Sequence, residues 1–126
     1  MLDKNSTIMV VDDMRVMRKS IMMFLKTLGY ANFIEAENGA DAVKKYQSNE
    51  VDFVFMDLVM PIQDGYQALK AIKQGDENAT VVMLTSIADE HILEKCLNKG
   101  ALGYIHKPLT PDTAEEKLMG VLTKVA

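Results

Sequence analysis

The amino-acid sequence predicts an α/β fold in which helices cover both faces of a five-stranded parallel sheet. Short runs rich in β-branched residues alternate with longer stretches whose apolar residues recur every three or four positions. Some short runs, such as residues 81–84, are continuously apolar, as expected for strands that are covered on both faces. The predicted strands are residues 6–11, 32–36, 51–57, 80–85 and 103–106.

The first long stretch predicts a helix with one apolar face. The residues on that face are Met14, Met17, Ile21, Leu25 and Leu28, whereas Arg15, Lys19 and Lys26 fall on the other side. Methionine at this spacing favours packing in the core, with an adaptable binding surface as the alternative. We therefore expect the apolar face to cover the sheet, with the helix stopping at Gly29.

Capping residues mark the start of further helices. Asn38 and Asp64 each precede a stretch with helical spacing and can accept a hydrogen bond from its first turn. The pair Thr110 and Pro111 is expected to open the last helix, because proline is favoured in a first turn.

Length and charge limit the function. We expect residues 1–126 to form a single domain, since 126 residues leave no room for a second core. The chain carries 14 basic and 18 acidic residues, with no dense basic cluster, so we expect no nucleic-acid partner. The early apolar run, residues 8–11, is too short for a signal peptide or a membrane span. The single Cys96, at core spacing, suits a reducing cytoplasm, where we expect the protein to act as a monomer.

Polar residues gather where the predicted strands end. They are Asp12 and Asp13 after the first strand, Asp57 after the third, Thr85 and Ser86 at the fourth, and Lys107 after the fifth. The carboxyl ends of parallel strands line the ligand crevice, so these groups should meet. Crowded carboxylates repel one another unless a cation intervenes, and oxygen ligands favour Mg²⁺. Taken singly, the acid pair could be a solvated turn and the lysine an ordinary surface residue.

The same residues form motifs that resemble the receiver domains of two-component response regulators. The motifs are Val-Val-Asp-Asp at 10–13, Met-Asp-Leu-Val-Met-Pro at 56–61, Leu-Thr-Ser at 84–86 and Tyr-Ile-His-Lys-Pro at 104–108. The resemblance spans essentially the whole chain and is closest to the stand-alone, CheY-like chemotaxis type. It implies the flavodoxin-like fold with strand order 2-1-3-4-5.

This resemblance implies a phosphorylation site. Asp57 would accept a phosphoryl group from a histidine kinase or a small acyl phosphate. Asp13, Asp57 and the backbone carbonyl of Val59 would hold Mg²⁺, for which Mn²⁺ is expected to substitute, and Asp12 would act through water. Lys107 would neutralise charge in a metaphosphate-like transition state. Apart from its own phosphorylation and dephosphorylation, we expect no enzymatic activity.

The resemblance also implies a switch. Thr85 would move inward to bond the phosphoryl group, Ser86 would meet its oxygens, and Tyr104 would fill the vacated space. This would reshape the face formed by the fourth helix, fifth strand and fifth helix, although Tyr104 could also be a plain strand aromatic. The family further implies a cis bond between Lys107 and Pro108, and we expect His106 to be exposed.

Two positions differ from many receivers. Val59 and Ile87, each two residues beyond a site residue, are apolar where polar groups are common. Apolar side chains cannot orient the attacking water, so we hypothesise slow dephosphorylation and a long-lived signal. The alternative is that both merely lie on the rim.

Other functions fit the sequence less well. A haloacid dehalogenase-type hydrolase needs a second acid where Val59 stands, and a flavodoxin-like electron carrier needs a hydroxyl-rich loop where Asp12 and Asp13 stand. A receiver that is never phosphorylated would be expected to lack a key residue. For output, we favour a chemotaxis regulator that docks on the flagellar switch, and the alternative is a phosphorelay shuttle that serves a histidine phosphotransfer protein.

Overall fold

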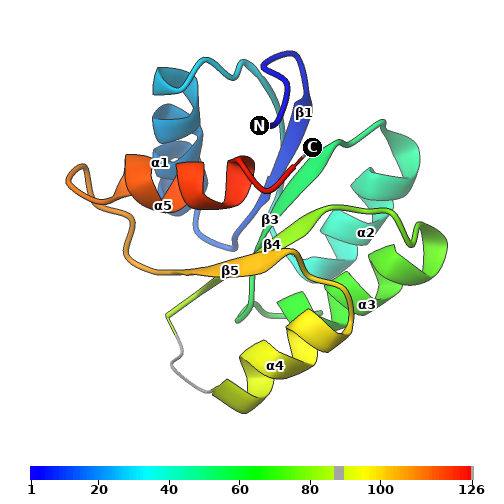
Figure 1. Ribbon diagram of the computed structural model, residues 1–126. Coiled ribbons are helices and arrows are strands. Elements are labelled where there is room, and N and C mark those ends of the chain that lie inside the picture. Colours follow the sequence, from blue (N-terminus) through cyan, green and yellow to red (C-terminus); the bar gives the residue numbers. More distant parts are fainter. Residues whose placement is uncertain (87–89, 126) are drawn as a thin grey trace.

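The computed structural model describes residues 1–86 and 90–125, which form three layers with a sheet between two groups of helices (Figure 1). The strands are β1 (Thr7–Val11), β2 (Asn32–Ala36), β3 (Phe53–Asp57), β4 (Val81–Thr85) and β5 (Gly103–His106). The helices are α1 (Arg15–Thr27), α2 (Gly39–Ser48), α3 (Gly65–Gly75), α4 (Glu90–Asn98) and α5 (Ala114–Leu122). All strand pairs are parallel, in the order β2-β1-β3-β4-β5, which confirms the predicted topology.

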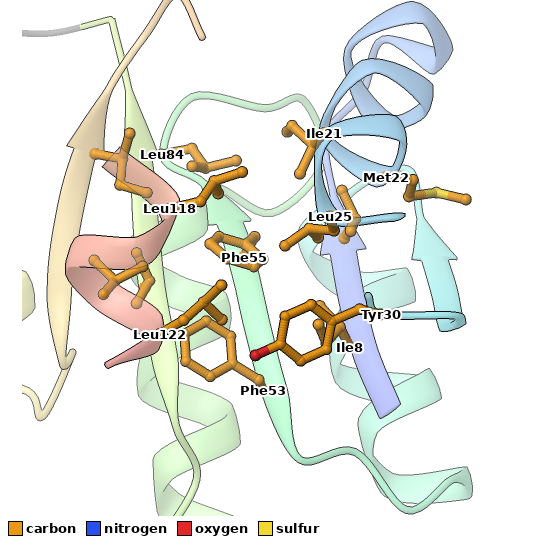
Figure 2. Close-up of a cluster of buried hydrophobic side chains, with 14 of the residues drawn as sticks. Ile8, Ile21, Met22, Leu25, Tyr30, Phe53, Phe55, Leu84, Leu118 and Leu122 are labelled. Atoms are coloured by element: carbon orange, nitrogen blue, oxygen red, sulfur yellow. The ribbon is translucent and has the colours of Figure 1, made fainter. Parts of the chain in front are cut away.

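Two hydrophobic clusters hold the layers together, one on each face of the sheet. Because side chains alternate along a strand, Ile8 and Val10 of β1 face one cluster while Met9 and Val11 face the other. The first cluster contains residues of α1 and α5 and is drawn in Figure 2. The second contains residues of α2, α3 and α4, including the buried thiol of Cys96, which the sequence predicted to be in the core. The central strands are therefore covered on both sides.

The predicted strands are confirmed with small shifts at their starts. β2 and β5 have the predicted bounds, whereas β1, β3 and β4 begin one or two residues later. At the start of β3, the carboxylate of Asp52 accepts a hydrogen bond from the Thr7 amide (2.8 Å). The Asp52 amide in turn donates to the Thr7 carbonyl (2.9 Å), so Asp52 joins the start of β3 to β1 through both its side chain and its backbone.

The cap residues of α2 and α3 are confirmed. The side chain of Asn38 accepts a bond from the Asp41 amide (2.8 Å). Asp64 and Gln67 form a reciprocal capping box at the start of α3. Gly29, which ends α1, has a φ of 100°, the left-handed conformation that glycine adopts readily.

The start of α5 was predicted too early. Thr110 and Pro111 lie in a turn, and the helix begins at Ala114. The carbonyl of Thr110 accepts bonds from both the Thr113 amide (3.0 Å) and the Ala114 amide (2.8 Å). The first of these bonds spans three residues, a tighter turn than an α-helix allows, so regular helix starts only after it.

The prediction that Met14 belongs to the buried face of α1 was wrong. Met14 is the extended N-cap residue, and 57% of it is exposed. Its backbone has left the helix, so its side chain no longer follows the helical spacing. The rest of the apolar face is confirmed, with Ile21 and Leu25 buried and Met17 and Leu28 partly buried.

A glycine brings α3 close to the end of β3. A Cβ atom at Gly65 would overlap the backbone oxygen of Asp57, whereas a Cβ at Gly120, inside α5, would meet nothing within 4 Å. The amide of Gly65 also donates to the Leu58 carbonyl (2.9 Å). The missing side chain at residue 65 therefore allows the start of α3 to fix the segment that carries Asp57.

We predict that Gly65→Ala lowers the free energy of unfolding by about 1–3 kcal/mol, because the added methyl group displaces backbone rather than a flexible side chain. Gly120→Ala is the matched control, and it should raise the free energy of unfolding by up to about 1 kcal/mol through better helix propensity. Urea unfolding monitored by circular dichroism measures both. Equal unfolding midpoints for the two variants would contradict the close contact at Gly65.

Candidate functional site

Three aspartates meet at the carboxyl edge of the sheet. Asp12 and Asp13 directly follow β1, and Asp57 is the last residue of β3, the strand paired with β1. Each aspartate offers a carboxylate oxygen, and these oxygens lie within 4.8 Å of one another. Asp12 and Asp57 are buried, while Asp13 is exposed. A set of hard oxygen ligands that is open to water on one side fits a divalent cation such as Mg²⁺.

Lys107 joins two of these acids. Its ammonium nitrogen lies 2.7 Å from Oδ2 of Asp12 and 3.1 Å from Oδ1 of Asp57. The backbone amide of Lys107 donates to the Thr85 carbonyl (2.8 Å), and the bond from Lys107 to Pro108 is cis, as the family resemblance implied. The Lys107 side chain, which follows β5, therefore extends past the end of β4 to Asp12, directly after β1, and to Asp57, at the end of β3.

Burial and charge act against each other in this cluster. Burial raises the pKa of Asp57, the Lys107 ammonium opposes that rise, and the carboxylates of Asp12 and Asp13 add to it. For Lys107, burial favours the neutral amine, but the two carboxylates outweigh it and its pKa is raised. The lysine thus remains a cation, while the pKa of Asp57 lies above that of a free aspartate.

Asp12 is the most firmly held of the three acids. Its amide donates to the Ala36 carbonyl (3.1 Å), and its Oδ1 accepts from the Met14 amide (2.9 Å). Its Oδ2 accepts from Lys107, and its backbone carbonyl accepts from Nη1 of Arg18 (2.8 Å). Every polar atom of Asp12 is bonded, and only 1% of the residue is exposed, so it serves as a fixed point for the cluster.

Arg18 and its partner Glu35 were not among the site residues predicted from the sequence. Arg18 lies between Met17 and Ile21 in α1, and only 13% of its side chain is exposed. A charged residue at that position of an apolar stripe was the available signal, because a buried charge requires a partner. Its partner, on β2, could not be identified from spacing.

The other predicted site residues border the acids. Thr85 is buried at the end of β4, and Ser86 after it is exposed. The side chain of Val59 is on the surface, with 57% of the residue exposed, so the expectation that it flanks the route of water is compatible with its placement. Ile87 lies outside the described residues. Tyr104 is partly exposed on β5, with its ring 5.3 Å from that of His106, which is exposed as expected.

The loop after Asp57 contains a strained residue. Ile62 has a φ of 65°, and the Gln63 amide bonds to the Pro61 carbonyl across it (2.9 Å), which makes a γ-turn. This φ is unfavourable for a β-branched side chain, and 79% of Ile62 is exposed. Two bonds directly after Ile62 hold the loop in this shape: the Gly39 amide donates to the Gln63 carbonyl, and the Gln67 amide donates to the cap residue Asp64.

Among the described residues, no helix has the length and apolar character needed to cross a membrane.

Comparisons with known proteins agree with this geometry. The family model for the response regulator receiver domain matches residues 8–119. Chemotaxis protein CheY of Halobacterium salinarum is 39% identical over 116 residues, which cover 92% of this chain and 96% of that protein. CheY of Bacillus subtilis is 39% identical over 111 residues, covering 88% of this chain and 92% of that protein. The resemblance stated from the motifs is therefore confirmed.

Solved structures confirm the fold. A chain of the CheX–CheY complex with BeF₃ and Mg²⁺ from Borrelia burgdorferi superposes with a TM-score of 0.85 and is 31% identical, covering 92% of this chain and 88% of that one. CheY4 of Vibrio cholerae superposes with a TM-score of 0.83 at 27% identity, covering 94% of this chain and 99% of that one. The strand order 2-1-3-4-5 is that of the flavodoxin-like fold.

We predict that millimolar Mg²⁺ raises the melting temperature, because a cation that binds only the folded chain stabilises it by mass action. Asp13→Asn should raise the melting temperature in EDTA, since it removes one of the repelling charges, and should reduce the increment that Mg²⁺ gives. Asp112→Asn, which changes an exposed acid outside the cluster, should leave both values unchanged. Thermal unfolding with and without Mg²⁺ measures the effect. The same Mg²⁺ increment in Asp13→Asn and wild type would contradict the site.

Proposed function

This chain belongs to the response regulator receiver family, and on that premise we propose that it is a phosphorylation-dependent signalling switch of a two-component system. Asp57 accepts the phosphoryl group from a histidine kinase, with Mg²⁺ as cofactor and Mn²⁺ as a substitute. The observation that carries the proposal is the Lys107 ammonium group, 3.1 Å from Oδ1 of Asp57 beside the three-acid cluster. The same arrangement fits phosphorylation by a small acyl phosphate.

In the proposed reaction, a carboxylate oxygen of Asp57 forms a bond to phosphorus as the bond between phosphorus and the donor's imidazole nitrogen breaks. The electron pair of the broken bond returns to that nitrogen, so the donor leaves as a histidine side chain. With an acyl phosphate, the bond that breaks is phosphorus to oxygen, and a carboxylate leaves. Asp57 itself becomes an acyl phosphate, and no oxidant or reductant takes part.

The residues of the site have distinct tasks in this step. Asp13, Asp57 and the Val59 carbonyl would hold Mg²⁺, with Asp12 acting through water. When bound, Mg²⁺ supplies positive charge that offsets the charge of the phosphoryl oxygens. The Lys107 ammonium, which already contacts Asp57, would offset the same charge.

The signal leaves through the surface of α4, β5 and α5. A phosphoryl group adds about −1.5 to −2 charges and new acceptors at the end of β3. Thr85 and Ser86, at the end of β4, supply hydroxyl groups to the phosphoryl group. Thr85 moves toward the phosphoryl group, and the Tyr104 side chain then fills the space that Thr85 leaves. The groove between β5 and α5 is lined by Tyr104, His106 and residues of α5, so its shape depends on that aromatic side chain. A ligand that contacts one arrangement better shifts the population toward it.

The favoured output is chemotaxis, through contact with the flagellar switch. Its support is the 39% identity to two chemotaxis CheY proteins over most of this chain. The second candidate is a phosphorelay shuttle that passes the phosphoryl group to a histidine phosphotransfer protein. This function requires the same site, with Asp57 as the residue that carries the phosphoryl group. In either case the protein acts in the cytoplasm as a monomer and catalyses only its own phosphorylation and dephosphorylation.

We predict that acetyl phosphate with Mg²⁺ adds one phosphoryl group to the wild-type protein and none to Asp57→Asn. Lys107→Met should lower the rate by about tenfold or more, because it removes a charge that stabilises the transition state. Intact-mass spectrometry follows the reaction, and Asp112→Asn serves as a control that should react like wild type. Full modification of Asp57→Asn would place the phosphoryl group elsewhere and overturn the proposal.

The output can be determined by binding. Protein held in the phosphorylated form should bind purified flagellar switch protein more tightly than the unphosphorylated form does. A shuttle would instead transfer its phosphoryl group to a purified histidine phosphotransfer protein. Isothermal titration calorimetry and a transfer assay on the same preparation distinguish the chemotaxis regulator from the shuttle. Equally tight binding of the phosphorylated and unphosphorylated forms to the switch protein, without transfer, would contradict both functions.

We predict that Val59→Asn speeds loss of the phosphoryl group several-fold, because an amide can orient the attacking water and an exposed valine cannot. The decay of purified phosphoprotein, measured after the phosphodonor is removed, gives the rate. Val59→Ala is the control for side-chain size alone. The hypothesis is lost if the asparagine and alanine variants decay at the wild-type rate.

A further inference from the structure

Arg18 extends from α1 to the carboxyl end of β1. Its Nη1 donates to the backbone carbonyl of Asp12 (2.8 Å), and its Nε donates to Oε1 of Glu35 (3.0 Å). Only 13% of the side chain is exposed. A planar guanidinium holds its donors in a fixed fork, so two bonds of this kind restrict both the distance and the direction of the groups they join.

Glu35 anchors the arginine from the neighbouring strand. It lies on β2 opposite Val10 of β1, and its Oε2 accepts from the ammonium of Lys19 (2.8 Å). The bond from Lys19 lowers the pKa of Glu35; burial opposes this, and Arg18 adds to the lowering. A glutamate is ionised at neutral pH even without this lowering, so the bond from Arg18 to Glu35 does not depend on Lys19.

These contacts form a continuous bonded path to the phosphoacceptor. It runs from Glu35 to Arg18, on to the carbonyl of Asp12, from the carboxylate of Asp12 to Lys107, and from Lys107 to Asp57. The path crosses β2, α1, β1, the end of β5 and β3. Since Asp12 is buried and bonded at every polar atom, a shift of its carbonyl moves its carboxylate and with it the ammonium at 2.7 Å.

We propose that Arg18, held by Glu35, is a positioning residue for phosphoryl transfer, because it fixes Asp12 and through Asp12 sets the place of the Lys107 ammonium beside Asp57. The inference rests on the proposed function of this site. Transfer of a phosphoryl group depends mainly on position and charge, so a displacement of about 1 Å at a distance from the chemistry can slow it up to about a hundredfold.

Lys19 provides a matched control. Both cations belong to α1 and both bond Glu35, but among the described residues Glu35 is the one hydrogen-bond partner of the Lys19 side chain, 48% of which is exposed. If Arg18 acted only through the ion pair between α1 and β2, Arg18→Met and Lys19→Met would change the phosphorylation rate to the same extent. A role through Asp12 belongs to Arg18 alone.

The test compares Arg18→Met, Arg18→Lys and Lys19→Met at a temperature where circular dichroism shows all of them folded. The maximal rate of phosphorylation by acetyl phosphate at saturating Mg²⁺ should fall about tenfold in Arg18→Met and less in Arg18→Lys, which keeps the charge and N–H donors but loses the planar fork. Lys19→Met should react at the wild-type rate. Equal rates in wild type and Arg18→Met, or equal losses in Arg18→Met and Lys19→Met, would overturn the proposal.

A second readout uses the protein without Mg²⁺. The Met14 amide donates to Oδ1 of Asp12, so its hydrogen exchange reports the position of that carboxylate. Exchange of this amide in EDTA should accelerate in Arg18→Met and stay at the wild-type rate in Lys19→Met. Unchanged exchange in Arg18→Met would overturn the proposal. If wild type itself accepts no phosphoryl group, the proposed function fails, whereas a reactive wild type with an equally reactive Arg18→Met leaves that function intact.

Discussion

The ammonium group of Lys107 lies between two buried carboxylates, those of Asp12 and Asp57, and much of the architecture serves that contact. A buried ion pair is costly to break, because each charge left alone is poorly solvated. The three residues come from the ends of different strands, so the pair forms only when β1, β3 and β5 all have their observed places in the sheet. Apolar strands, covered on both faces, supply the rigidity that keeps those ends in register.

The three acids divide into fixed and available groups. Asp12 is bonded at every polar atom and acts as part of the frame. Asp57 is buried but meets Lys107 through one oxygen, and Asp13 is exposed. Under the proposed function, Asp57 would react and Asp13 would admit a metal while Asp12 holds its place. Gly65 contributes to the frame by letting α3 approach the backbone of Asp57.

Most of the fold and the cluster of acids could be predicted from the sequence, because strand runs, caps and strand-end residues are local signals. The family motifs added the strand order and the cis bond at Pro108. The start of α5 could not be predicted, since the turn at Thr110 depends on hydrogen bonds between particular backbone groups. Nor could the contact of Arg18 with Asp12 be predicted, because no periodicity tells which distant carbonyl a buried cation will meet.

The place of β5 at the edge of the sheet has a consequence for motion. A strand with one neighbour opens more readily than a central strand, and β5 has only four residues with alternate side chains exposed. The cation of the site is therefore carried by a weakly protected element, while Asp12 and Asp57 belong to the most protected ones. Brief openings of β5 would withdraw the ammonium and leave the acids in place, so the charge balance of the site would change each time that edge strand opened.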